Sequence, residues 1–253
     1  MLKKKQNLNK KLFNLFKKLN IKKKTKLMIH SNAAGLYQFN LFNKNISKRI
    51  FFKNLLKTIG KKGDLVVPVY NYDFTQKKPF FVDKINSQVG ELGNFFLRNF
   101  RVERTINPIF SHAMLKSKKI YKYDPKDCLG KNSFFNYLHK KNFKIFGFCA
   151  PLNAMTFLHY VECRNKVRYR FNKKFSSFII KGKKKTHFTI NYNVGKKNLD
   201  YSLKSSKIEN ALKKNKTFKI LSFGKFFCWT VDARDVFNII TKRIKKNNNY
   251  LIK

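Results

Sequence analysis

Three short, strongly apolar runs constrain the fold of this chain most. They read KLMIH at Lys26–His30, DLVVPVY at Asp64–Tyr70 and KIFGF at Lys144–Phe148. Runs of this length and character are typical of strands that are buried on both faces, as the strands of parallel sheets are. A helix expected over Ser47–Ile59, closed by Gly60, joins the first run to the second. The order strand, helix, strand therefore predicts an α/β fold with a parallel element.

The remaining segments are assigned from the same periodicities and from turn residues. We expect helices over Val89–Phe100 and Ser133–His139, from Ala154 and from Asp232; strands near Ser111–Leu115, Phe218–Phe223 and Phe226–Val231; a hairpin over Lys173–Asn193; and a long loop over Asn71–Ser87. No internal repeat or linker divides the chain, so we expect one domain over residues 1–253.

The N-terminal segment, residues 1–24, predicts a basic amphipathic helix. Leu12, Leu15 and Phe16 recur at helical spacing among lysines, and lysines interrupt every apolar run before it reaches signal-peptide length. Such a helix lies on a membrane or packs onto the domain behind it, and we expect the second. The longest uncharged stretch, Ile145–Val161, contains Gly147 and Pro151 and does not predict a transmembrane helix, so no stable membrane insertion is expected.

The charge balance is extreme, with 58 Lys+Arg against 12 Asp+Glu and a net charge of +46. A hydrophobic fraction of 43% with 16% aromatic residues nevertheless excludes a disordered basic tail. The lysines are spread along the whole chain, which favours compositional drift in an AT-rich genome over selection. Such a surface attracts polyanions. A basic nucleic-acid-binding protein therefore stays an alternative, but no recognised nucleic-acid motif is present and we expect no specific nucleic-acid partner.

The four cysteines show neither CxxC spacing nor zinc-knuckle spacing with the histidines, so we expect no metal. Free thiols are typical of a reducing compartment, which favours a cytoplasmic location. Cys149 lies in an apolar run and is interpreted as a small buried hydrophobic residue rather than a nucleophile.

The segment Ala150–Glu162, APLNAMTFLHYVE, carries the most informative chemistry. It follows a predicted strand with a turn and a helix, which places it at the carboxyl edge of the sheet, where open α/β folds bind ligands. His159 and Glu162 share one face of that helix, and a neutral imidazole oriented by a carboxylate accepts protons near neutral pH. The spacing alone, however, favours a structural hydrogen-bonded pair over a catalytic one.

Several segments together resemble the aminoglycoside 3-N-acetyltransferase family, acetyl-CoA-dependent antibiotic N-acetyltransferases whose α/β fold differs from that of the GNAT acetyltransferases. The resemblance covers residues 10–170 well and the remainder loosely. The matching segments are HSNAAGL at His30–Leu36, GDLVVPVY at Gly63–Tyr70, GELGNFFLRNFRVERTINPIFS at Gly90–Ser111, and Cys128–Glu162, where the family pattern A-P-L-N-x-x-T-x-L-H-Y-x-E is met. The resemblance implies a single α/β domain with a mixed central sheet flanked by helices. It also implies that the protein is a monomer or a homodimer.

The resemblance also implies a site. His159 corresponds to the histidine that deprotonates the acceptor amine, and a turn that opens a helix offers free N–H groups to the phosphates of CoA. The implied residues are His159 and Glu162 for catalysis; His30, Ser31, Asn32 and Ser111 for acetyl-CoA binding; and Asp73, Asn94, Asn153 and Thr156 for the acceptor.

Two positions depart from the family pattern. Asn94 stands where many members have glutamate, and Asn107 stands where many have histidine before proline. If that glutamate polarises the base, Glu162 or a backbone carbonyl has to replace it. A catalytically inactive relative of the fold is therefore a further alternative.

The acceptor is expected to be a small-molecule amine on an amino sugar. Aminoglycosides are polycations and a surface of +46 repels them, whereas it attracts the anionic CoA. We therefore expect an anionic acceptor, a sugar nucleotide or a surface glycan, in preference to antibiotic resistance as the native role.

Overall fold

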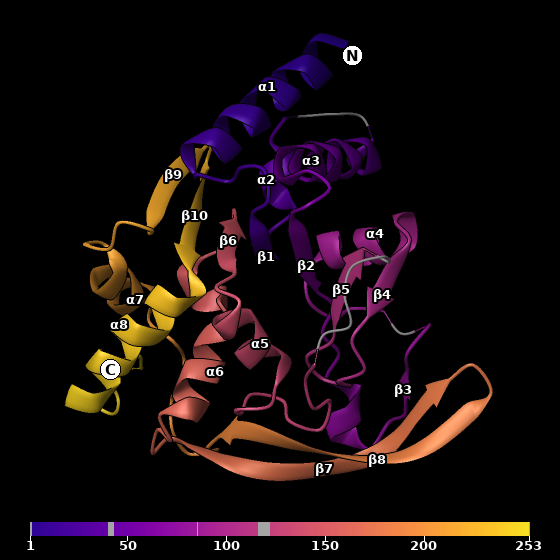
Figure 1. The fold of residues 1–253 in the computed structure, drawn as a ribbon, viewed down its shortest axis with the longest axis vertical. Helices are drawn as coiled ribbons and strands as arrows, with labels where there is room; N and C mark the ends of the chain where they lie inside the picture. The colour runs from indigo at the N-terminus through magenta and orange to yellow at the C-terminus, as the bar shows by residue number, and fades with distance from the viewer. Residues whose placement is uncertain (1, 40–42, 85, 116–121, 253) are drawn as a thin grey trace.

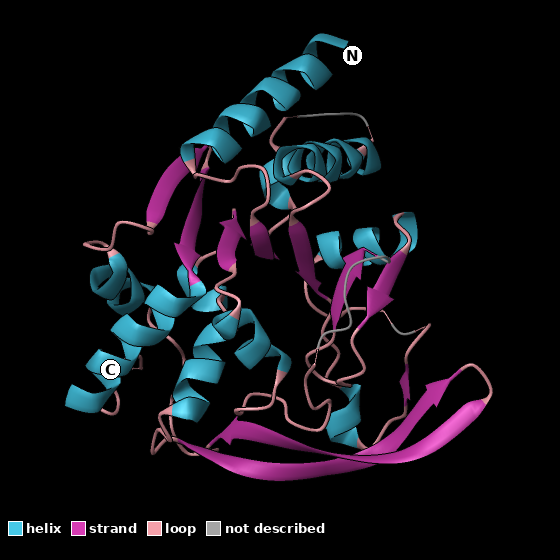
Figure 2. Ribbon diagram, in the orientation of Figure 1, coloured by secondary structure: helices cyan, strands magenta, loops and turns pink. Residues whose placement is uncertain are grey.

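The computed structural model describes residues 2–39, 43–84, 86–115 and 122–252. A seven-stranded sheet runs through the middle of the molecule with helices on both faces (Figure 1, Figure 2). Its strands lie in the order β4-β5-β2-β1-β6-β10-β9. This arrangement confirms the predicted fold class, a mixed central sheet flanked by helices.

The three apolar runs form the parallel centre of the sheet. Strand β1 (Lys26–Ser31) lies between β2 (Asp64–Pro68) and β6 (Lys144–Phe148) and is parallel to both. Successive residues of β1 point to opposite faces, so Met28 enters one hydrophobic core and Ile29 enters the other. Burial on both faces explains why these strands lack polar alternation in the sequence.

Antiparallel strands complete both sides of the sheet. Strands β5 (His112–Leu115) and β4 (Val102–Arg104) continue it beyond β2, and β10 (Phe226–Asp232) and β9 (Lys219–Phe223) continue it beyond β6. The sequence patterns located three of these strands but missed β4, whose three residues are too few to display a period.

The helices form two layers, one on each face. One layer holds α1 (Leu2–Lys18), α2 (Ala34–Tyr37), α3 (Lys44–Ile59) and α4 (Glu91–Asn99), and the other holds α5 (Phe134–Lys140), α6 (Phe157–Arg164), α7 (Ser205–Leu212) and α8 (Ala233–Lys246). The loop expected over residues 71–87 contains the 3₁₀ turn η1 (Asp73–Gln76) and the two-residue strand β3 (Phe80–Phe81), and its residue 85 lies outside the described residues. Helix α7 is a further element that the sequence patterns missed.

Helix α1 packs onto the body of the protein. Leu8, Leu12 and Phe16 are fully buried, and the Phe16 ring makes edge contacts with Phe51 of α3 and Phe146 of β6, each with 6.0 Å between ring centroids. Among the described residues, no helix combines the length and the apolar character that crossing a membrane requires.

The predicted hairpin is present and is longer than expected. Strands β7 (Arg170–Lys181) and β8 (Lys184–Gly195) pair antiparallel along their whole length and curve across the lower edge of the molecule in Figure 1. Strand β3 pairs with β7 to form a small second sheet. Phe175 and Ile190 face the core, whereas the opposite face is open to solvent.

Strand β10 fixes the segment that follows β6. A Cβ on Gly147 would lie 2.0 Å from Trp229, so only glycine lets the indole cross β6 at this point. The Trp229 Nε1 group then donates a hydrogen bond of 2.7 Å to the Ala150 carbonyl. The turn that leads into the 3₁₀ turn η2 (Leu152–Ala154) and α6 is therefore held by a strand from the C-terminal part of the chain.

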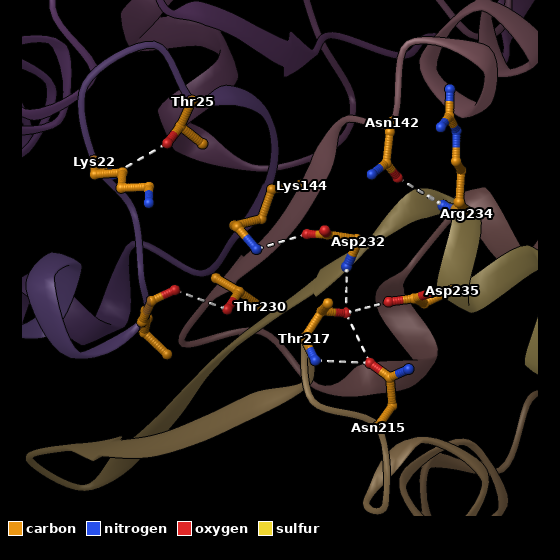
Figure 3. A network of polar contacts seen from close by, with 11 residues as sticks. Lys22, Thr25, Asn142, Lys144, Asn215, Thr217, Thr230, Asp232, Arg234 and Asp235 are labelled. Atoms are coloured by element: carbon orange, nitrogen blue, oxygen red, sulfur yellow. Dashed lines mark hydrogen bonds and ion pairs between the residues drawn. The ribbon is translucent and has the colours of Figure 1, made fainter.

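A polar network holds the opposite end of β6 (Figure 3). The Lys144 ammonium lies 2.6 Å from the Asp232 carboxylate, and the Asp232 amide donates to the Thr217 hydroxyl. The Thr217 hydroxyl lies 2.7 Å from Asp235 and 2.8 Å from Asn215, both of which present acceptor oxygens. The network joins β6, β10 and the first turn of α8 and fixes the end of the sheet that lies away from the carboxyl ends of β1, β2 and β6.

We expect Phe16→Ala to lower the free energy of unfolding by about 3–5 kcal/mol, because it removes a fully buried ring between α3 and the sheet. Phe13→Ala is the matched control on the same helix, since the Phe13 side chain is 59% exposed. Urea unfolding measures both variants. Equal losses in the two variants would contradict the packing of α1 described above.

Candidate active site

A cavity of about 310 Å³ opens at the carboxyl ends of β1 and β2, beside the turn that precedes α6. The polar side chains that line it are His30, Ser31, Tyr70, Tyr72, Asn153, Thr156 and His159. A larger hollow, about 820 Å³, lies beside β4 and contains none of the predicted site residues. The smaller cavity is the candidate site because the groups that can transfer a proton are gathered there.

His159 and Glu162 form the hydrogen-bonded pair that their spacing on α6 predicts. The His159 Nδ1 atom lies 2.6 Å from Glu162 Oε2. The Glu162 side chain is completely buried, whereas a quarter of the His159 side chain is exposed at the cavity. The pair thus presents an imidazole to the cavity and keeps its carboxylate away from solvent.

Two further residues, which the sequence analysis missed, stabilise the buried carboxylate. The Arg170 Nε atom lies 2.8 Å from Glu162 Oε2, and the Tyr169 hydroxyl donates a hydrogen bond of 2.8 Å to Oε1. Burial by itself raises the pKa of the Glu162 carboxyl, but the charges and hydrogen bonds of His159, Arg170 and Tyr169 outweigh it. The net result is a Glu162 pKa below its ordinary value, so the carboxyl stays ionised near neutral pH.

The ionised carboxylate determines which imidazole nitrogen carries the proton. Because Glu162 Oε2 is an acceptor, His159 Nδ1 must carry hydrogen to make the 2.6 Å contact. The neutral ring then has its lone pair on Nε2. The Arg170 Nη2 atom, 3.0 Å from His159 Nδ1, brings a positive charge to the same place and balances the carboxylate behind the ring. An imidazole backed in this way is able to accept one proton from a group that enters the cavity.

The structure brings His30 and Ser31 to the cavity and leaves Asn32 outside its lining. His30 ends β1 and is 7% exposed, and its Nε2 atom meets no hydrogen-bond partner in the described residues. Burial, with the nearby His159 charge, lowers the pKa of His30 to about 4, so the ring is neutral near neutral pH. The Asn32 side chain accepts from the Ala34 amide and opens the short helix α2.

A second buried polar cluster lies at the same edge of the sheet. The Tyr70 hydroxyl lies 3.1 Å from His112 Nε2 and also interacts with the Thr156 hydroxyl. Burial, and next the charge of His30, lower the pKa of His112 to about 3. The neutral histidine and the tyrosine were not singled out from the sequence, because nothing there indicates that β2 and β5 are neighbours.

Of the four predicted acceptor residues, Asn153 and Thr156 line the cavity and the other two do not. Asp73 lies in a neighbouring shallow depression and accepts a hydrogen bond of 3.0 Å from Gln88. The Asn94 side chain makes two hydrogen bonds of 2.8 Å to the backbone of Ser87. These four roles in acceptor binding stay predictions.

Ser111, predicted for acetyl-CoA binding, is completely buried between β2 and β5. Its hydroxyl donates to the Val69 carbonyl at 2.8 Å and accepts from Arg104 Nε at 2.9 Å. Both contacts hold the strands together, and its role in cofactor binding stays a prediction. The other departure from the family pattern, Asn107, is also buried and accepts from the amides of Ile109 and Phe110, which shapes the turn before β5.

Cys149 is buried, as expected for a small hydrophobic residue. Its Sγ atom lies 3.6 Å from Cys228 Sγ, and both thiols are free. This contact, and burial, raise the pKa of the Cys149 thiol far above its ordinary value. The thiol therefore stays protonated and does not act as a nucleophile. Among the described residues no group of three or more potential metal ligands comes together.

Comparison with known proteins identifies relatives of this chain. The family model described as aminoglycoside 3-N-acetyltransferase matches residues 28–245, which includes the C-terminal part that the motifs covered only loosely. No curated protein sequence matches the chain.

Several solved structures share the fold. The apoenzyme of aminoglycoside acetyltransferase AAC(3)-IVa is 17% identical, with a TM-score of 0.75 over 97% of this chain and 91% of that one. AAC-IIIb, solved as a binary complex with CoASH, is 16% identical, with a TM-score of 0.78 over 94% and 96% of the two chains. AAC-VIa, solved with bound sisomicin, is 14% identical, with a TM-score of 0.75 over 94% and 97%.

The buried charge pair has a measurable consequence for stability. Arg170→Met leaves the Glu162 carboxylate without its counter-charge, and we expect a loss of about 3–5 kcal/mol in the free energy of unfolding at neutral pH. The double variant Arg170→Met/Glu162→Gln removes both charges and should lose less than the sum of the single variants. Strict additivity in urea unfolding would contradict the pairing.

The same pair predicts an acid dependence. Because the folded pKa of Glu162 is depressed, its contribution to stability is complete above the unfolded pKa of about 4.3 and is lost as the pH falls through the folded pKa. The difference in unfolding free energy between the parent and Glu162→Gln should therefore shrink below that pH. A constant difference down to the acid transition would show that Glu162 is not held ionised.

Proposed function

This chain belongs to the aminoglycoside 3-N-acetyltransferase family, a family of acyltransferases, and we propose that it moves an acetyl group from acetyl-CoA to the amino group of an amino sugar. The observation that carries the proposal is the His159–Glu162 pair at the cavity, with 2.6 Å between Nδ1 and Oε2. The proposal assigns His159 as the general base and Glu162 as the residue that orients it.

The proposed chemistry is a direct transfer. The acceptor nitrogen attacks the thioester carbonyl carbon, and His159 Nε2 takes a proton from that nitrogen as the C–N bond forms. The C–S bond then breaks, and the proton on His159 passes to the leaving thiolate to give CoASH. Alignment of the two substrates in one cavity supplies much of the rate enhancement that such a reaction needs.

Acetyl-CoA fits the chain on two grounds. One structural neighbour was solved as a complex with CoASH. In addition, the phosphates of CoA are anionic and the chain carries a net charge of +46. We place the cosubstrate beside His30 and Ser31, where β1 ends at the cavity and the short helix α2 begins.

The alternative of an inactive relative rested on Asn94 and Asn107, and Asn107 accepts hydrogen bonds from the amides of Ile109 and Phe110. The contacts of Asn94 weaken that alternative, because Asn94 bonds to Ser87 and His159 bonds to Glu162. An asparagine at position 94 therefore leaves the histidine with a carboxylate partner. The nucleic-acid alternative has no comparable support, since the described aromatic side chains lie mainly in the two hydrophobic cores.

We expect His159→Ala to lower the rate of amine-dependent CoA release by about 10²–10⁴-fold, the usual contribution of a general base. A panel of aminoglycosides, free amino sugars and nucleotide-linked amino sugars supplies the acceptors. His187→Ala is the matched control, because His187 is exposed on the hairpin and lies outside the cavity lining. Near-normal turnover by His159→Ala would remove this residue from the mechanism.

We also expect acetyl-CoA to bind more weakly as the salt concentration rises, because salt screens contacts between phosphates and a basic surface. Isothermal titration with acetyl-CoA at increasing NaCl concentration measures this effect. The titration needs no unreactive analogue of acetyl-CoA, because it measures binding without turnover. A dissociation constant that does not change with salt would show that the basic surface has no part in binding the cosubstrate.

A further inference from the structure

The Thr156 hydroxyl stands at the N-terminus of α6 but does not cap the helix. A threonine in the N-cap position usually accepts a hydrogen bond from the second or third amide of its helix. Among the described residues the Thr156 side chain accepts no such bond, and its hydroxyl interacts with the Tyr70 hydroxyl instead. Thr156 precedes His159 by three residues, and both side chains line the cavity. The hydroxyl is therefore used at the cavity and not in the helix.

The Tyr70 hydroxyl is held from behind by a histidine. It lies 3.1 Å from His112 Nε2, and the two rings meet edge to face with 5.2 Å between their centroids. Tyr70 is 2% exposed, and His112 is completely buried against the rings of Phe134 and Phe135. The three polar side chains thus form a row that begins at the cavity with Thr156 and ends in the core with His112.

The buried imidazole determines the direction of the hydrogen bonds in this row. Burial, and next the charge of His30, lower the pKa of His112 to about 3, so the ring is neutral and carries one proton. The Phe110 backbone has the opposite effect on this pKa, which identifies its carbonyl as an acceptor for a ring proton.

The carbonyl of Phe110 is assigned to the Nδ1 side of the ring. The Nε2 atom of His112 already faces Tyr70, and among the described residues no group makes a full hydrogen bond to Nδ1. The carbonyl contact is therefore a weak one, but it favours the proton on Nδ1. In that tautomer the lone pair lies on Nε2, next to the tyrosine.

Both hydroxyl groups then donate inward, away from the cavity. With a lone pair on His112 Nε2, the Tyr70 hydroxyl has to donate to the ring. Burial, and next the charge of Tyr72, raise the pKa of Tyr70, whereas Thr156 lowers it, as a hydroxyl that donates to the phenol oxygen does. A hydroxyl has a single hydrogen, so Thr156 presents only lone pairs to the cavity.

We propose that His112 is a positioning residue of the acetyl transfer: through Tyr70 it makes the Thr156 hydroxyl an acceptor for an N–H group of the amine. The inference rests on the proposed function, because it concerns the same reaction. It goes beyond that function by giving the buried histidine a task. It also excludes Thr156 as a donor to the thioester oxygen.

The proton balance of the transfer agrees with this arrangement. A primary amine has two N–H groups, one for His159 Nε2 and one for Thr156 Oγ1, and holding both fixes the direction of its lone pair. As the C–N bond forms, His159 takes the first proton and later passes it to the thiolate that leaves when the C–S bond breaks. The second hydrogen stays on the amide nitrogen of the product, beside Thr156.

The first test is kcat/KM for CoA release at saturating acetyl-CoA, with sisomicin and D-glucosamine as acceptors. His112→Phe removes the acceptor at the end of the row, so the two hydroxyl groups are free to reverse. We expect kcat/KM for the amine to fall about tenfold, the scale of one hydrogen bond, with the KM for acetyl-CoA unchanged. His112→Gln places an acceptor oxygen near Tyr70 and should restore most of the loss. Equal losses in the two variants would overturn the proposal.

Two further variants separate positioning from packing. His139→Phe is the matched control, because His139 Nδ1 lies 3.0 Å from the Tyr160 hydroxyl but His139 is outside the cavity lining, and it should leave kcat/KM for the amine unchanged. In a Tyr70→Phe background the row is already broken, so adding His112→Phe should cause no further loss. A full additional tenfold loss in the double variant would contradict action through Tyr70.

A measurement without turnover distinguishes this inference from the proposed function. Nitrogen-15 NMR of the imidazole side chains reports which ring nitrogen carries the proton, and the His112 signal is identified by its loss in His112→Gln. We expect the proton on Nδ1 at neutral pH, and a proton on Nε2 would overturn the proposal. If the proton is on Nδ1 but no amine is acetylated, the proposed function is rejected and the direction of the row stands.

Discussion

The burial of one carboxylate, Glu162, is the interaction on which the rest of the site depends. A buried charge is tolerated only when partners replace the water that it has lost, and three partners surround this one. They come from two different places in the chain: His159 from the same helix, and Tyr169 and Arg170 from the start of the hairpin. The orientation of His159 therefore depends on the docking of the β7–β8 hairpin against α6, because both rely on the same contacts to Glu162. A hairpin displaced from α6 would take Arg170 with it and leave His159 beside an unbalanced negative charge.

Much of the fold could be predicted from the sequence, because its signals are local. The parallel strands β1, β2 and β6 are apolar on both faces, and the paired histidine and glutamate of α6 follow from a spacing of three residues. Contacts between segments that are distant in the chain could not be predicted in this way. Tyr70 and His112 are neighbours only because β2 and β5 pair, and no period in either segment indicates that pairing. Arg170 and Tyr169 lie within eight residues of Glu162, but the turn after α6 decides that they point back toward it.

The residues that the family pattern indicates for the site fall into two groups in the structure. Asn153, Thr156, His30 and Ser31 line the cavity, whereas Ser111 and Asn94 make contacts that maintain the fold around it. A pattern of this kind marks positions where substitution is costly. In a single sequence, positions where the cost comes from packing cannot be told from positions where it comes from chemistry.

The contact between Trp229 and the turn after β6 has a consequence for synthesis of the protein. The indole donates to the Ala150 carbonyl across a separation of 79 residues, and β10 is the strand that completes the sheet beside β6. On a ribosome the segment that carries His159 emerges well before the strand that holds its entrance turn. Pairing at such separation is slow compared with helix formation and leaves apolar surface open in the meantime. The nascent chain thus passes through a stage in which α6 has formed but the turn before it lacks the contact with Trp229. The site is complete only when nearly the whole length of the chain has been made.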